Sequence, residues 1–200
     1  MKKIIKWIFL GFVFICVLPA GLIALVVHKL FGSSLFYDLF AQCFSMTPGF
    51  IGTAVRACYY KQTLSQSYMD LNMGFGSFIS KVGTKIGHGV FINGRNIIGL
   101  ADIGDGVVVA NYVSILSGGR QHNFDDPEVG ILEKEGTYSC VTIGRDVFIG
   151  DHCVVMADIG EKSIIGSGTL VVKPIPPYSV AIGNPAKVIK DRRQTGSQNA

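Results

Sequence analysis

Aliphatic residues recur at every sixth position over two long stretches of the chain, and no other feature constrains the fold more. Each stretch contains one shift of register: Ile86, Ile92, Ile98, Ile103, Val109 and Ile115, and then Ile143, Ile149, Val155, Ile159, Ile165 and Val171. A period of six matches neither the 3.6 residues of a helical turn nor the alternation of an ordinary strand. It predicts short parallel strands stacked in coils, with a corner after each strand, which is a β-solenoid.

Glycine follows many of these aliphatic residues, as in Ile86-Gly87, Ile103-Gly104 and Ile149-Gly150. A glycine fits a tight corner in which a side chain would clash. Ordinary strands joined by glycine turns would not keep a six-residue register through both stretches. The sequence therefore predicts about five coils with the aliphatic residues pointing inward.

The closing stretch, IGEKSIIGSGTLVVKPIPPYSVAIGNPAKVIK, is more specific than the repeat. With the six-residue period, it resembles the left-handed parallel β-helix of hexapeptide-repeat acyltransferases, in their acetyltransferase branch. The likeness covers about Gly74 to Lys190. It implies an O- or N-acyltransferase that uses acetyl-CoA as acyl donor, usually a homotrimer with active sites between neighbouring subunits.

The N-terminal third differs in composition from the rest of the chain. Residues 1–69 hold six basic side chains and one acid, a net charge of +5 against +4 for the whole chain, so the remainder carries −1. Basic residues beside apolar sequence indicate an anionic membrane surface and not nucleic acid, for which there is no reader motif. We expect a membrane-embedded segment over 1–32, interfacial or capping helices over 33–68, the β-helix over 69–190 and a polar tail over 191–200.

The apolar stretch from Ile4 to Val27 is long enough to span a bilayer, but Pro19 and Gly21 interrupt it. Lysines at the N-terminus favour a cytoplasmic start. A single span would then separate the catalytic domain from cytosolic acetyl-CoA. We therefore expect a re-entrant hairpin, with helices from about Lys3 to Leu18 and on to about Leu30, and a Pro-kinked span as the alternative. Both chain ends would be cytoplasmic.

The segment from Asp38 to Tyr60 is apolar and aromatic, and Pro48-Gly49 divides it into two short helical pieces. We expect these pieces to lie along the inner leaflet, with Arg56 and Lys61 reaching lipid headgroups. The alternative is that they cap the open end of the β-helix. The five cysteines form no CxxC pair, which indicates reduced thiols in the cytosol, and no cysteine pair has zinc-ligand spacing.

Between Ser117 and Cys140 the repeat is suspended, and a long excursion from a compact solenoid is more often functional than accidental. The resembling family extrudes a similar loop whose histidine is the catalytic base, which implies that role for His122. Asn123, Asp125 and Asp126 flank it and are candidates for binding the acceptor or orienting the imidazole. His28 lies in the membrane segment, whereas His88 and His152 lie in hexapeptide turns.

The resemblance also implies positions for both substrates. Asn111 matches an acceptor-pocket asparagine, with an asparagine ladder at a solenoid corner as the alternative. The residues matched to coenzyme A binding are Asp151 and Ser167 for the pantetheine arm, and Lys173, Lys187 and Lys190 for the nucleotide phosphates. A solvated basic rim is the alternative for the lysines, and Asp151 stands where the family commonly has a small neutral residue.

These features favour an O-acetyltransferase of the cytoplasmic membrane surface. We expect a hydroxyl of a saccharide or lipid-linked saccharide as the acceptor, and no metal. Two other readings remain open. The first is a non-catalytic trimeric scaffold. The second is a γ-type carbonic anhydrase, which requires a zinc-histidine pairing that His88, His122 and His152 do not show.

Overall fold

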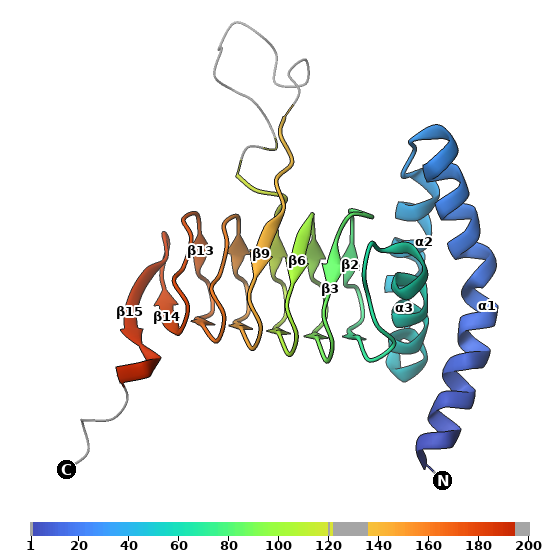
Figure 1. The fold of residues 1–200 in the computed structure, drawn as a ribbon, viewed down its shortest axis with the longest axis horizontal. Helices are drawn as coiled ribbons and strands as arrows, with labels where there is room; N and C mark the ends of the chain where they lie inside the picture. Colours follow the sequence, from blue (N-terminus) through green and yellow to red (C-terminus); the bar gives the residue numbers. More distant parts are fainter. Residues whose placement is uncertain (1, 120, 122–135, 195–200) are drawn as a thin grey trace, which may run out of the picture.

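The structure is a computed structural model that describes residues 2–119, 121 and 136–194 of the chain. Three helices come first: α1 (Lys2–Phe31), α2 (Leu35–Ser45) and α3 (Gly49–Thr63). They stand at one end of a solenoid of short strands, and α1 is the outermost element (Figure 1). The described chain leaves the solenoid after β8 (Ser114–Ile115) and rejoins it at β9 (Val141–Ile143), and β15 (Lys187–Asp191) lies at the opposite end of the solenoid from the helices.

The strands form three sheets along the solenoid. The seven-stranded sheet contains, in order, β1 (Asn72–Met73), β4 (Phe91–Ile92), β7 (Val108–Val109), β10 (Phe148–Ile149), β12 (Ile164–Ile165), β14 (Ser179–Ile182) and β15 (Lys187–Asp191). The five-stranded sheet contains β13 (Leu170–Val171), β11 (Val154–Val155), β8 (Ser114–Ile115), β5 (Ile97–Ile98) and β2 (Phe78–Ile79). The three-stranded sheet contains β3 (Lys85–Ile86), β6 (Ala101–Ile103) and β9 (Val141–Ile143).

The six-residue pattern predicts the core correctly. All twelve aliphatic residues of the pattern are at most 1% exposed. They stack in register through the coils, as in Ile92–Val109–Ile149–Ile165 of the seven-stranded sheet, where the four strands that carry them pair in parallel. The first coil also buries Met73 and Ile79, which precede the predicted start of the repeat. Among the described strands, only the last pair, β14 with β15, is antiparallel, and it closes the solenoid.

The outward faces of the three sheets differ in polarity. Phe91 and Phe148 on the seven-stranded sheet and Ile97 on the five-stranded sheet are 40–46% exposed. The three-stranded sheet instead turns Lys85 and Asp102 outward, 3.6 Å apart as an ion pair. Two of the three faces are therefore apolar, and one is polar.

Helices α2 and α3 cap the first coil, which was the alternative reading of this segment. The hydroxyl of Tyr37 donates to the carbonyl of Ile79 at 2.9 Å, and the Ile79 N–H donates to the hydroxyl of Tyr60 at 2.9 Å. These bonds satisfy backbone groups at the open end of the solenoid, which would otherwise be left without partners.

The expectation that Arg56 reaches lipid headgroups is wrong. Its side chain is only 1% exposed. The guanidinium donates to four backbone carbonyls within 3.2 Å: Phe44, Ser45, Thr47 and Met73. Arg56 thus ties α3 to the end of α2, to the turn between these helices and to strand β1 from inside the cap. Lys61, by contrast, is exposed, and its contact with lipid headgroups stays a prediction.

The predicted hairpin at Pro19–Gly21 is also wrong, because α1 is one continuous helix with Pro19 inside it. Helix α3 supports α1 on both sides of the proline. The Cys58 thiol donates to the carbonyl of Leu10 at 3.7 Å, and Gly21 packs against the side chain of Gln62. A Cβ on residue 21 would collide with that side chain, so this glycine serves close helix packing and not a turn.

Candidate active site

Three of the predicted site residues lie on one edge of the solenoid, where the seven-stranded sheet turns into the five-stranded sheet. We call this edge the Asn111 corner; it consists of residues 93–96, 110–113, 150–153 and 166–169. The Asp151 carboxylate accepts hydrogen bonds from the backbone N–H of Asn111 at 2.7 Å and from its side-chain amide at 3.0 Å. The Ser167 hydroxyl accepts from the Asp151 N–H at 3.1 Å. The structure therefore brings Asn111, Asp151 and Ser167 together as a ladder.

The same ladder continues one coil toward the helices, where the Asn111 side-chain oxygen accepts from the Gly94 N–H at 3.1 Å. Each polar side chain thus caps a backbone donor of the neighbouring coil. Hydrogen bonds from Asn111 hold the pKa of Asp151 below its ordinary value, so the carboxylate is ionised at neutral pH. Within this chain Asp151 fixes the orientation of the Asn111 amide, a role that the sequence did not predict.

An aromatic stack also stands on the Asn111 corner, and the sequence analysis missed it. The rings of Tyr112 and His152 lie 4.9 Å apart and are tilted by only 4°. The Arg95 guanidinium lies 5.7 Å from the Tyr112 ring. All three residues have φ between 58° and 62°, a conformation rare for residues other than glycine. It projects their side chains in one row, and the spacing of one residue per coil is the signal that could have revealed the row.

The excursion leaves from a different edge, where the five-stranded sheet turns into the three-stranded sheet. We call this edge the loop corner; it includes residues 80–84, 99–100, 156–158 and 172–174 as well as the base of the excursion. The Ser139 N–H donates to the Ser117 carbonyl at 3.0 Å and closes that base. Tyr138 is 54% exposed, and the Lys81 ammonium lies 4.1 Å from its ring. His122, Asn123, Asp125 and Asp126 lie outside the described residues.

The predicted phosphate-binding lysines do not form one cluster with the Asn111 corner. Lys173 lies on the loop corner, two coils beyond the base of the excursion, and its side chain is exposed. Lys187 and Lys190 lie on β15, opposite Ile182 and Val180 of β14, and are also exposed. One subunit therefore spreads the candidate residues over two edges of the five-stranded sheet and the closing hairpin.

Neither His88 nor Cys140 lies in a setting that supports catalysis or metal binding. His88 lies on the third edge, 3.1 Å from the Asp70 carboxylate, and so on a different corner from His152. Among the described residues, no group of three or more His, Cys, Asp or Glu side chains gathers as a metal site would require. Partial desolvation raises the pKa of the Cys140 thiol, which disfavours the thiolate that a nucleophile needs.

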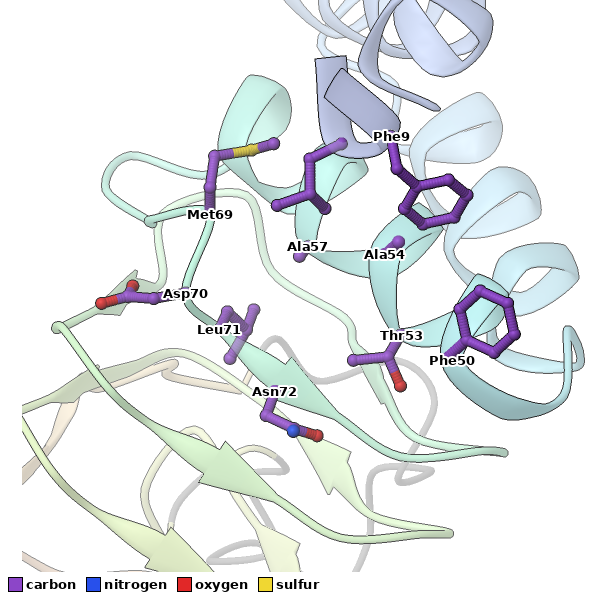
Figure 2. A pocket seen from close by; sticks show the side chains of 10 residues that line it. Phe9, Phe50, Thr53, Ala54, Ala57, Met69, Asp70, Leu71 and Asn72 are labelled. Carbon is purple, nitrogen blue, oxygen red and sulfur yellow. The ribbon is translucent and has the colours of Figure 1, made fainter. Parts of the chain in front are cut away.

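A cavity of about 290 Å³ lies in the helical cap, away from both corners. Apolar side chains of α1 and α3, among them Phe9, Phe50 and Ala54, line one side, and Asp70 and Asn72 line the other (Figure 2). No residue of the Asn111 corner or of the loop corner lines it, so this cavity is not part of the candidate active site.

Comparisons with known proteins are consistent with this geometry. The chain is 40% identical over 93 residues to galactoside O-acetyltransferase of Escherichia coli K12, covering 44% of this chain and 43% of that protein. It spans less than half the length of the curated relatives that it matches. A scan against protein-family models finds no match.

Solved structures cover more of the molecule. A maltose O-acetyltransferase from Clostridium difficile 630 is similar over 77% of this chain and 83% of its own, with 26% identity and a TM-score of 0.66. A galactoside acetyltransferase in complex with coenzyme A is similar over 79% and 80%, with 26% identity and a TM-score of 0.64. These neighbours confirm the predicted left-handed parallel β-helix, and the chain is similar over most of its length to hexapeptide-repeat acetyltransferases.

Proposed function

We propose that this protein is an acetyl-CoA-dependent O-acetyltransferase that modifies a hydroxyl of a membrane-associated saccharide, with His122 as the general base. The observation that carries the proposal is the excursion. The solenoid is interrupted at the loop corner, and the segment inserted there in the sequence contains the one histidine that lies outside the repeats and α1. The similarity to galactoside and maltose O-acetyltransferases supports the reaction and the saccharide class.

The chemistry follows from the residue types. A neutral His122 accepts the proton of the acceptor hydroxyl, and the oxygen attacks the thioester carbonyl of acetyl-CoA. Backbone N–H groups of the Gly118–Gly119 segment are candidates to stabilise the tetrahedral oxyanion. The carbon–sulfur bond then breaks, and His122 returns its proton to the departing coenzyme A sulfur. The products are the acetyl ester and free coenzyme A.

A homotrimer is part of the proposal, because one chain separates the loop corner from the Asn111 corner by the width of the five-stranded sheet. In a cyclic assembly the loop corner of one subunit can meet the Asn111 corner of the next. The two apolar sheet faces support this arrangement, since a heterologous interface needs two different surfaces on each subunit. The acceptor amide and the catalytic base would then come from neighbouring chains.

We also propose that the protein works at the cytoplasmic face of the membrane. Residues Trp7–Phe31 of α1 have the length and apolar character of a membrane helix, with a mean hydropathy of 2.8 and only 28% of the segment buried. This location keeps the active site beside cytosolic acetyl-CoA and beside inner-leaflet lipid that carries a saccharide.

Acetyl transfer is tested by mass spectrometry of envelope saccharides and lipids from cells with and without the protein, and by the rate of coenzyme A release in vitro. His122→Ala should lower the rate by about 10²–10⁴-fold, the usual contribution of a general base. His88→Ala is the matched control, because His88 is exposed on another corner and should leave the rate unchanged. A His122→Ala variant with more than a tenth of the wild-type rate refutes the assignment.

A further inference from the structure

The outer face of α1 is apolar over the whole length of the helix, although the opposite face is already buried. Leu10, Val13, Val17 and Ala24 are at most 6% exposed and form the inner face. Twelve large apolar side chains of α1 remain 36–76% exposed: Ile4, Ile5, Trp7, Ile8, Phe12, Ile15, Leu18, Leu22, Ile23, Val26, Leu30 and Phe31. A helix that is apolar all round needs an apolar environment on both sides. Protein supplies one side, and a second partner must supply the other.

Helix α1 does not obtain this second apolar environment by spanning a bilayer, because it is packed along its length on α2 and α3, which cap the solenoid. Leu10 contacts Cys58 of α3, and Gly21, eleven residues further along, contacts Gln62. Helix α3 is in turn fixed to the first coil by Arg56 and Tyr60. A spanning α1 would therefore carry α3 and the first strands into the hydrocarbon with it.

Charged groups beside α1 make that arrangement costly. Lys61 is exposed and is the chain neighbour of Gln62, whose side chain packs on Gly21 in the middle part of the apolar stretch. A spanning α1 would place Lys61 well inside the bilayer, where a charged side chain is strongly disfavoured.

We propose instead that α1 lies in the plane of an anionic bilayer, with its outer face immersed, and that the solenoid stands on the membrane by its helical end. Figure 1 shows α1 running across the end of the solenoid, with α2 and α3 between it and the first strands. All the apolar side chains of its outer face then meet lipid at one depth. Basic residues lie at both ends of the helix, Lys2, Lys3 and Lys6 in the sequence and Lys29 at its close, and they match anionic headgroups.

This orientation is compatible with the proposed trimer. Only its consequence for the acceptor rests on the proposed function. A three-fold axis parallel to the solenoids puts all three α1 helices at the same end, so three surfaces dock at once and avidity strengthens binding. The loop corner of the third coil lies about 30 Å from the α1 axis. This distance counts about 10 Å for each of two layer spacings, from α1 to α2 and α3 and from these to the first coil, and about 5 Å for each of the two spacings between coils. A saccharide tethered to lipid can reach that height.

The depth of α1 is measured with full-length protein bound to vesicles of phosphatidylcholine and phosphatidylglycerol. Trp7 is the chain's one tryptophan, so Trp7→Phe provides a silent background. Ile8→Trp, Ile15→Trp and Leu22→Trp are then made singly, at exposed positions spaced one heptad apart on the same face. Quenching by lipids brominated at different acyl positions gives the depth of each tryptophan.

An in-plane helix gives the same depth for all three tryptophans, within about 3 Å, because they share one face. A spanning helix gives depths that differ by about 10 Å per heptad step, and that result overturns the proposal. These readings do not depend on acetyl transfer, so an inactive protein with equal depths contradicts the proposed function and leaves the docking mode intact.

A second measurement covers docking itself. Ile8→Glu combined with Ile15→Glu should lower partitioning onto the vesicles by about 100-fold or more, since two large apolar side chains lose their burial. Ile189→Glu, at the opposite end of the solenoid and 59% exposed, is the matched control and should bind as wild type does. If wild-type protein does not bind the vesicles and instead forms a dimer through the outer face of α1, a second copy of the chain covers α1. That result would refute lipid docking.

Discussion

The solenoid and the helical cap bury their residues by different rules. In the solenoid a local repeat decides burial, so every sixth residue points inward and the next coil reproduces the contact. In the cap, burial depends on partners far away in sequence, such as Arg56 with Met73 and Tyr37 with Ile79. The two regions also expose apolar surface differently: the solenoid on two sheet faces, the cap on α1. A periodic fold can therefore be read from short windows of sequence, whereas a cap of this kind cannot.

The largest effect is expected from substitutions on the apolar sheet faces. They test whether these faces form the trimer interface while α1 binds the membrane. Ile97→Glu combined with Phe148→Glu puts charge on both apolar faces and should convert a trimer into inactive monomers, since buried unpaired charges are not tolerated in an interface. The measurement is mass by light scattering, corrected for detergent, together with the rate of coenzyme A release.

Thr142→Glu combined with Lys85→Gln changes the net charge by the same −2 on the polar three-stranded face and should leave the trimer unchanged. Vesicle binding should survive in both double variants, though more weakly in the monomer. A wild-type protein that is a stable and active monomer would contradict the role given to the sheet faces.

The next effect concerns the polar centre of the cap. Arg56→Met leaves four buried or part-buried carbonyls without their donor, and should lower the free energy of unfolding by about 3 kcal/mol or more. The urea unfolding curve should also split, because the cap loosens before the solenoid does. Lys61→Met, an exposed change five residues further along the same helix, should shift the free energy of unfolding by less than about 0.5 kcal/mol. Equal losses in the two variants would mean that Arg56 does not hold the cap together.

These cases show what the sequence could predict of the fold. The six-residue repeat predicted the β-helix, the inward residues and the place of the excursion. It did not predict that Arg56 is buried, because an arginine in an apolar segment near a membrane usually points to headgroups and its four acceptors are scattered from Phe44 to Met73. Pro19 and Gly21 also led us to expect a bend in the apolar segment. The sequence of α1 alone does not show that α3 supports this helix on both sides of the proline.

A third prediction compares two glycines, one from each region. A Cβ on Gly150 would lie 2.6 Å from the backbone nitrogen of Ser167 in the next coil, whereas a Cβ on Gly11 of α1 would meet nothing within 4 Å. Gly150→Ala should therefore lower the free energy of unfolding by about 1–3 kcal/mol through overpacking. Gly11→Ala should raise it by up to about 1 kcal/mol, because alanine favours the helix. Thermal unfolding of both variants checks the opposite signs.

The candidate site was predictable to the extent that it follows the repeat. Asp151 and Ser167 are one coil apart in sequence, so their meeting at one corner with Asn111 follows from the period. The stack of Tyr112 on His152 was not predictable, because it needs positive φ at residues that seldom adopt it. The same register also places Lys173 on a different edge, because it follows Val171, the third aliphatic residue of its coil, whereas Asn111 follows Val109, the second.

The smallest effect is a pH dependence at the Asn111 corner. Hydrogen bonds from Asn111 lower the pKa of Asp151 in the folded protein, so its ionised form is favoured by folding. A carboxyl group with a lowered pKa stabilises the fold above the unfolded pKa of about 3.9, and this stability is lost as the pH falls through the folded value. Asp151→Asn should thus be slightly less stable than wild type at pH 7, and the difference should shrink once the pH falls below about 4. Chemical unfolding of both proteins between pH 7 and pH 3 measures it. A difference that stays constant with pH would show that Asp151 acts on the Asn111 corner through its shape and not its charge.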